Sequence, residues 1–151
     1  MKHWIKLAFA MIAAAAFASI ASTYASAQGA AARGTTAKVA KSRLGRILVD
    51  SRGITLYDFV ADKRGRSSCY SACATYWPPV LTKGKPHAGR GVRASLLGTT
   101  KRKNGKLEVT YNHHPLYYFI GDRKPGQATG QGLNQFGAPW WALSPAGKEI
   151  H

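Results

Sequence analysis

The sequence predicts a mainly β domain built from two pseudo-symmetric antiparallel hairpin repeats, with short helical turns. The first observation behind this prediction is a motif that occurs twice: residues 56–62 (LYDFVAD) align without a gap with residues 116–122 (LYYFIGD). The second is that β-branched and aromatic runs, separated by turn-forming residues, dominate the chain around both copies. A segment that recurs in this way implies two equivalent units that share one core.

The ungapped alignment also extends upstream, where it pairs Ile47 with Leu107 and Val49 with Val109. Because side chains alternate across a strand, the tyrosine and the phenylalanine of each copy share one face. Large aromatic side chains dominate core energetics, so these four residues are predicted to lie at the centre of the shared core. They are Tyr57, Phe59, Tyr117 and Phe119.

Strands and turns follow from the same patterns. Residues 45–49 and 54–60 form a predicted hairpin around a turn at 50–53, and residues 106–111 and 116–120 form a second one around 112–115. Asn104-Gly105 is the strongest two-residue hairpin signal, and it joins residues 99–103 to the strand that follows. Short helical turns are predicted within residues 68–76 and 92–97.

The boundaries of the domain come from composition. Residues 1–27 have a basic start, an apolar alanine-rich stretch and an Ala25-Ser26-Ala27 cleavage motif, which together predict a signal peptide. Residues 28–43 are predicted to be a disordered basic linker. Residues 44–151 then form the domain, with repeat 1 at about 44–80 and repeat 2 at about 99–145.

A signal peptide predicts export to the periplasm or the extracellular medium. After cleavage no transmembrane segment is expected, since no further apolar run approaches the length of a spanning helix. No cysteine lies near the cleavage motif, so the chain is predicted not to be lipid-anchored. The sequence predicts no particular oligomeric state.

The charge of the chain predicts an anionic partner. Lysine and arginine number 22 against 6 acidic residues, for a formal net charge of +16. Such a surface attracts anionic polymers or an anionic envelope surface, and its densest basic stretch is residues 101–106. Recognised nucleic-acid modules are absent from the sequence, so no specific nucleic-acid binding is expected.

Asp62 and Asp122, which end the two motif copies, have two interpretations. In the favoured one each aspartate caps backbone N–H groups of a turn, as in Asp62-Lys63-Arg64-Gly65. In the other they are ligands or acids in a site formed where the repeats meet. Catalytic templates such as G-x-S-x-G and H-E-x-x-H are absent from the sequence, and no enzyme activity is predicted.

Cys69 and Cys73 are the only cysteines of the chain, and export favours a local disulfide between them over metal ligation or redox activity. His113 and His114 are adjacent and point to opposite faces of an extended backbone, which makes them a poor chelating pair. No metal site and no cofactor are therefore predicted. Trp140, like Trp77, is expected to cover the core, although a tryptophan could also stack on a flat ligand.

These motifs in combination resemble the bacterial "secreted repeat of unknown function" family, predicted lipoproteins with a Yx(F/W/Y)xxD motif. The resemblance is carried by the two Tyr-x-Phe-x-x-Asp copies and by Cys69-x-x-x-Cys73-Ala74-x-x-Trp77-Pro78-Pro79. It is also carried by His114-Pro115-Leu116-Tyr117, the glycines from Gly126 to Gly132, and Phe136-Gly137 to Trp140. This chain departs from the lipoprotein members in lacking a lipobox cysteine, and His113 stands where a turn glycine is expected.

Two hypotheses of function follow. The leading one is an exported, non-catalytic envelope or extracellular protein that binds an anionic or flat ligand. The alternative is a periplasmic metal or redox protein, or an enzyme, that uses Asp62, Asp122 and the Cys69/Cys73 pair. The resemblance implies no settled activity, although some related proteins are linked to alkane catabolism.

Overall fold

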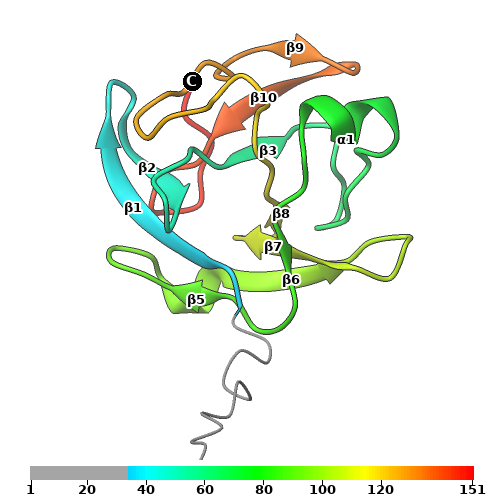
Figure 1. Cartoon of the computed structure of the whole chain (residues 1–151), viewed down its shortest axis with the longest axis horizontal. Coiled ribbons are helices and arrows are strands. Elements are labelled where there is room, and N and C mark those ends of the chain that lie inside the picture. The colour runs from blue at the N-terminus through cyan, green and yellow to red at the C-terminus, as the bar shows by residue number, and fades with distance from the viewer. Residues whose placement is uncertain (1–33) are drawn as a thin grey trace, which may run out of the picture.

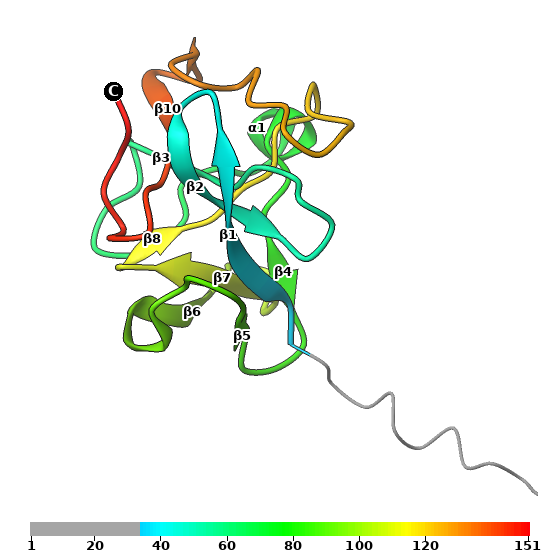
Figure 2. The ribbon, with the colours of Figure 1, turned by 90° about the vertical axis from the view of Figure 1, so that its left-hand side faces the viewer.

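The computed structural model describes residues 34–151, so the predicted signal peptide and residues 28–33 lie outside the described residues. The described chain is mainly β, and its strands form three small sheets around a common interior (Figures 1 and 2). The strands are β1 (Thr36–Ser42), β2 (Gly45–Asp50), β3 (Tyr57–Phe59), β4 (Leu81–Thr82), β5 (His87–Ala88), β6 (Leu97–Lys101), β7 (Leu107–Tyr111), β8 (His114–Pro115), β9 (Asn134–Gln135) and β10 (Ala138–Ala142). Among the described helices, none has the length and apolar character needed to cross a membrane.

Each repeat begins with an antiparallel hairpin. In repeat 1, β2 is paired along its whole length with β1, from Asp50 opposite Ala37 to Gly45 opposite Ser42. In repeat 2, β6 pairs with β7 through the predicted turn at Asn104-Gly105, where Gly105 has a φ of 80°. The prediction of a disordered linker is therefore wrong over Thr36–Ser42. The Ala/Lys composition of that segment hides a strand because its stability comes from pairing with β2 rather than from its own side chains.

After its hairpin, each repeat turns back and sends its motif across the interior. In repeat 1 the turn lets the N–H of Leu56 donate to the carbonyl of Leu48, and in repeat 2 the N–H of Leu116 donates to the carbonyl of Val109. The donor follows the acceptor by eight residues in repeat 1 and by seven in repeat 2. The predicted pairing of Val49 with Val109 is thus wrong by one residue. A one-residue slip moves a side chain to the other face of a strand.

The two motif copies meet at an isolated antiparallel bridge between Tyr57 and Tyr117. The N–H of each tyrosine donates to the carbonyl of the other, with N···O distances of 2.9 and 2.8 Å. Beyond the bridge, β3 pairs with β10, which in turn pairs with β9. This reciprocal contact is the centre of the pseudo-symmetry that the repeat predicts.

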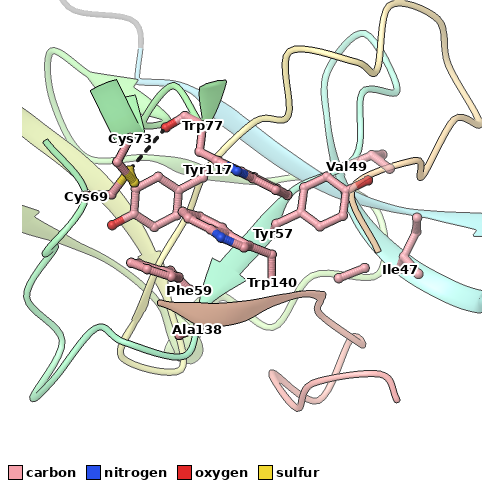
Figure 3. Packing of buried hydrophobic residues seen from close by; sticks show 11 residues of the cluster. Ile47, Val49, Tyr57, Phe59, Cys69, Cys73, Trp77, Tyr117, Ala138 and Trp140 are labelled. Carbon is pink, nitrogen blue, oxygen red and sulfur yellow. Dashed lines mark hydrogen bonds between the residues drawn. A yellow bond between two sulfur atoms is a disulfide. The ribbon is translucent and has the colours of Figure 1, made fainter. Parts of the chain in front are cut away.

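The alternation along the motif divides the interior into two clusters. Tyr57, Phe59 and Tyr117 lie in one cluster together with the disulfide and two tryptophans (Figure 3). Leu56 and Leu116 lie in the other cluster. The predicted assignment of faces is therefore confirmed for the leucine, tyrosine and phenylalanine of each copy. It is wrong at the next position, because a turn begins after each phenylalanine: Val60 packs against the first cluster, and Ile120 is exposed.

Short helical turns occur where the sequence predicts them. Helix α1 (Ala72–Tyr76) follows the first motif, and the 3₁₀ turn η2 (Ala94–Leu96) precedes β6. Helix α1 places Cys73 and the following Trp77 against the first cluster.

Candidate functional site

The motif tyrosines and aspartates form hydrogen bonds between the repeats. The hydroxyl of Tyr57 donates to Oδ2 of Asp122 at 2.5 Å, and the hydroxyl of Tyr117 donates to Oδ2 of Asp62 at 2.7 Å. Each repeat therefore supplies a hydroxyl to the aspartate of the other one. Burial raises the pKa of both tyrosines well above the usual value, so the hydroxyls keep their protons.

The second oxygen of each aspartate anchors the loop of its own repeat. Oδ1 of Asp62 accepts from the N–H and the hydroxyl of Ser68, both at 2.7 Å. Oδ1 of Asp122 accepts from the N–H of Thr129 at 2.8 Å and from its hydroxyl at 2.6 Å. These bonds reach six and seven residues along the chain, beyond the four-residue turn predicted for Asp62. A hydroxyl residue at a similar interval after each aspartate is a signal that the sequence contained.

The aromatic residues of the repeats form a continuous stack in the first cluster. The rings of Trp77 and Trp140 lie parallel with centroids 3.9 Å apart, and Phe59 stacks on Trp140 at 4.0 Å. The two tyrosines meet the tryptophans edge to face from opposite sides (Figure 3). Both tryptophans are fully buried, so these rings offer no open face to a flat ligand.

Cys69 and Cys73 form the predicted disulfide, and both are buried. The disulfide lies beside Trp77, and the Sγ atom of Cys69 contacts the carbonyl of that tryptophan (Figure 3). The two sulfur atoms are bonded to each other in this structure, which supports a structural role for the pair.

A basic groove lies on the surface next to the disulfide. It consists of two adjoining hollows, of about 840 and 450 Å³, that share Arg66 and Ser67 in their walls. The lining of both hollows contains no acidic residue. Its exposed basic residues are Lys63, Arg64, Arg66, Lys101 and Lys103.

The floor of the basic groove contains a buried ion pair that sequence reasoning missed. Arg102 contacts Glu108 at 2.5 Å and also donates to the hydroxyl of Ser67 and to the carbonyl of Cys69. Burial raises the pKa of Glu108 to about 7, and the ion pair acts in the opposite direction. The guanidinium of Arg102 also lies 4.4 Å from the ring of Tyr70. This network joins the β6–β7 hairpin to the loop that carries the disulfide.

The adjacent histidines of the turn in repeat 2 have different surroundings, and one of them has an unexpected partner. His113 is exposed and has a φ of 66°, which explains why a glycine is expected there. Nδ1 of His114 lies 3.1 Å from Oδ2 of the buried Asp58. The hydrogen bond to Asp58 raises the pKa of His114. Glu149 lies beside both, and burial and the charge of Asp58 raise its pKa.

The fold and the buried motif define a two-repeat β protein in which each repeat completes the hydrogen bonds of the other. A family model described as "secreted repeat of unknown function" matches residues 38–81 and 98–144, and the chain belongs to this family. The two matched segments coincide with the two structural repeats, and the first of them begins inside β1. The family is described as secreted, so the protein is exported. No curated protein and no solved structure matches the chain.

Proposed function

We propose that this exported protein is a non-catalytic binding protein that holds an anionic polymer of the cell envelope in the basic groove. The observation that carries the proposal is the combined lining of the two hollows, where five exposed basic side chains gather without an acidic residue. A run of like charges along a groove attracts a linear polyanion over several contacts, because each charge adds to the local potential.

The groove also supplies directional contacts. The hydroxyl of Tyr70 accepts from the N–H of Lys103 at 3.2 Å and can also donate to a ligand, and the ring of Tyr70 lies 5.0 Å from Nζ of Lys103. The disulfide and the Arg102–Glu108 pair fix the backbone beneath these side chains. A rigid floor reduces the conformational entropy that is lost on binding, because the backbone is already ordered.

The two motif aspartates and the stacked tryptophans are already occupied inside the protein, which favours a polymer-binding surface elsewhere. Asp62 and Asp122 each accept three hydrogen bonds within the protein, and the stacked tryptophans are buried. These residues build the interior. Export to the periplasm or to the extracellular medium would bring the groove into contact with anionic envelope polymers.

The test is binding of inorganic polyphosphate and of vesicles rich in anionic lipid, each measured at low and at high salt. Polyphosphate binding should weaken steeply as salt rises, because exposed charges are screened over about 10 Å at 0.1 M salt. The combined variant Arg64→Ala, Arg66→Ala and Lys101→Ala should weaken it by about tenfold or more. Binding to vesicles alone would favour a membrane surface over a polymer.

The matched control removes three exposed basic residues from the loop around β5. The control substitutions are Lys83→Ala, Lys85→Ala and Arg90→Ala. Both variants lower the net charge equally, so an effect of overall charge would appear in each. An equal loss of binding in the two variants, or no binding at low salt, would contradict the proposal.

A further inference from the structure

A second polar cluster lies away from the groove, where three distant parts of the chain meet. Asp58 is the central residue of β3, His114 begins β8, and Glu149 lies in the segment after β10, where it bridges to Leu143. One potential ligand atom from each of Asp58, His114 and Glu149 lies within 4.8 Å of the other two. We call these three residues the Asp58 cluster.

Asp58 is the least satisfied member of the Asp58 cluster. Its side chain is 1% exposed, and its Oδ2 lies 3.1 Å from Nδ1 of His114. Its Oδ1 has no hydrogen-bond partner among the described residues. A buried carboxylate oxygen without a donor is unfavourable, and a second carboxylate beside it adds repulsion. His114 partners one oxygen of this carboxylate, and the other oxygen is left for a ligand from outside the protein.

Glu149 and His114 leave the Asp58 cluster open on one side. Their side chains are 26% and 34% exposed, so both are reachable from solvent while still mostly covered. A hollow of about 410 Å³, lined in part by His113 and Arg64, leads to His114. Nε2 of His151 lies 3.3 Å from Oε2 of Glu149, and the side chain of His151 is well exposed. A small ion can therefore enter from this side.

The donor atoms favour one class of ion. Two carboxylates and one imidazole suit a divalent transition metal, whereas Ca²⁺ and Mg²⁺ prefer oxygen alone and Cu(I) prefers sulfur. Ligand atoms bound about 2.0–2.2 Å from a tetrahedral Zn²⁺ lie about 3.3–3.6 Å from one another, so the 3.1 Å between Nδ1 of His114 and Oδ2 of Asp58 needs only a small widening to admit the ion. The two negative charges of the carboxylates balance the charge of one such ion.

We propose that Asp58, His114 and Glu149 bind one divalent transition-metal ion of the Zn²⁺ class, with a remaining position open to solvent. The site links β3 of repeat 1 to β8 of repeat 2 and to the C-terminal segment. Its three ligand residues lie outside the basic groove, although Arg64 lines both the groove and the hollow that leads to His114, and metal binding does not depend on polyanion binding.

The experiment is calorimetric titration of the metal-stripped, exported chain with Zn²⁺, with Ca²⁺ as the comparison ion. Wild type should bind one Zn²⁺ per chain and should not bind Ca²⁺ with similar affinity. His114→Gln and Glu149→Gln should each weaken Zn²⁺ binding by about 100-fold or more, since loss of even an outer-shell partner costs 10–100-fold. Bound Co²⁺ should give a visible absorption band that both variants lose.

His87→Gln is the matched control, because His87 is an exposed histidine on β5 outside the Asp58 cluster. It should bind Zn²⁺ as wild type does. Asp58→Asn adds a second test, since its folding can be checked by circular dichroism before the titration. The proposal is overturned if wild type binds no Zn²⁺, or if folded His114→Gln and Glu149→Gln bind it as tightly as His87→Gln does. If Asp58→Asn has a higher melting temperature than wild type and the same Zn²⁺ affinity, Asp58 is not a metal ligand. The carboxyl groups of Asp58 and Glu149 would then share a proton instead, which contradicts the proposal.

Discussion

Repeat 1 and repeat 2 have the same residue types at the positions that face the first cluster, with Tyr57 and Phe59 matching Tyr117 and Phe119. They differ at the position between, which is Asp58 in repeat 1 and Tyr118 in repeat 2. The hydroxyl of Tyr118 donates to Asp50 at 3.2 Å, whereas Asp58 faces His114 with one oxygen unpartnered. The symmetric residues build the core, and an asymmetric one builds a candidate site.

The hairpins show a second difference of the same kind. The carbonyls of Leu48 and Val109 accept the equivalent hydrogen bonds of the two turns. Aligned on these carbonyls, Ile47 of β2 takes the position that Glu108 holds in β7. Ile47 packs in the first cluster, while Glu108 pairs with Arg102 below the basic groove. The disulfide next to this ion pair also occurs in repeat 1 alone. Departures from symmetry thus gather beneath the groove and around the Asp58 cluster.

The largest expected effect tests the symmetric core. Trp77→Ala and Trp140→Ala should each lower the free energy of unfolding by about 3–5 kcal/mol, because each removes a fully buried ring from the stack. Denaturation in urea measures both. Trp141→Ala is the control, since Trp141 is only half-buried, and it should cost clearly less. A small effect for one of the two buried tryptophans would break the equivalence of the repeats.

The next effect tests the asymmetric ion pair. Burial holds the pKa of Glu108 at about 7 in the folded protein, above the ordinary value of 4.5. The folded state then binds the proton more tightly, so this carboxyl contributes stability below pH 4.5 that is lost as the pH rises through about 7. Over this range the free energy of unfolding of wild type should fall by about 3 kcal/mol relative to that of Glu108→Gln.

The measurement is urea denaturation of both proteins at several pH values from 4 to 8. Glu108→Gln serves as the reference for wild type, because every other titrating group is common to the two proteins. If the difference between them does not change with pH, Arg102 keeps Glu108 ionised throughout, and the ion pair dominates over burial.

The smallest effect tests the reciprocal hydrogen bonds. Tyr57→Phe and Tyr117→Phe should each cost about 1–3 kcal/mol, because each leaves Oδ2 of a mostly buried aspartate without its donor. Thermal and urea unfolding give both values. Tyr118→Phe is the control, since Asp50 keeps its other donors and the cost should be lower. Unequal losses for the first two variants would show that the repeats share the stability unevenly.

Much of the fold could be predicted because its signals are local. The alternation along residues 56–59 and 116–119 separates two buried faces, and the Asn104-Gly105 turn sets the register of β6 and β7. The disulfide also follows from two cysteines in an exported chain. The strand β1 escaped prediction because its side chains are small or charged, and the one-residue difference between the turns is invisible to an ungapped alignment.

The sequence by itself determined that there are two repeats, which side chains of each motif share a face, and that the surface is cationic, since spacing and composition decide these properties. Only the tertiary structure decided that each tyrosine serves the aspartate of the other repeat, and that Asp58, His114 and Glu149 meet. The physical reason is distance along the chain. These residues are between 35 and 91 positions apart. The Tyr57–Tyr117 bridge, the pairing of β3 with β10 and the Leu143–Glu149 bridge bring their polar atoms within reach of one another.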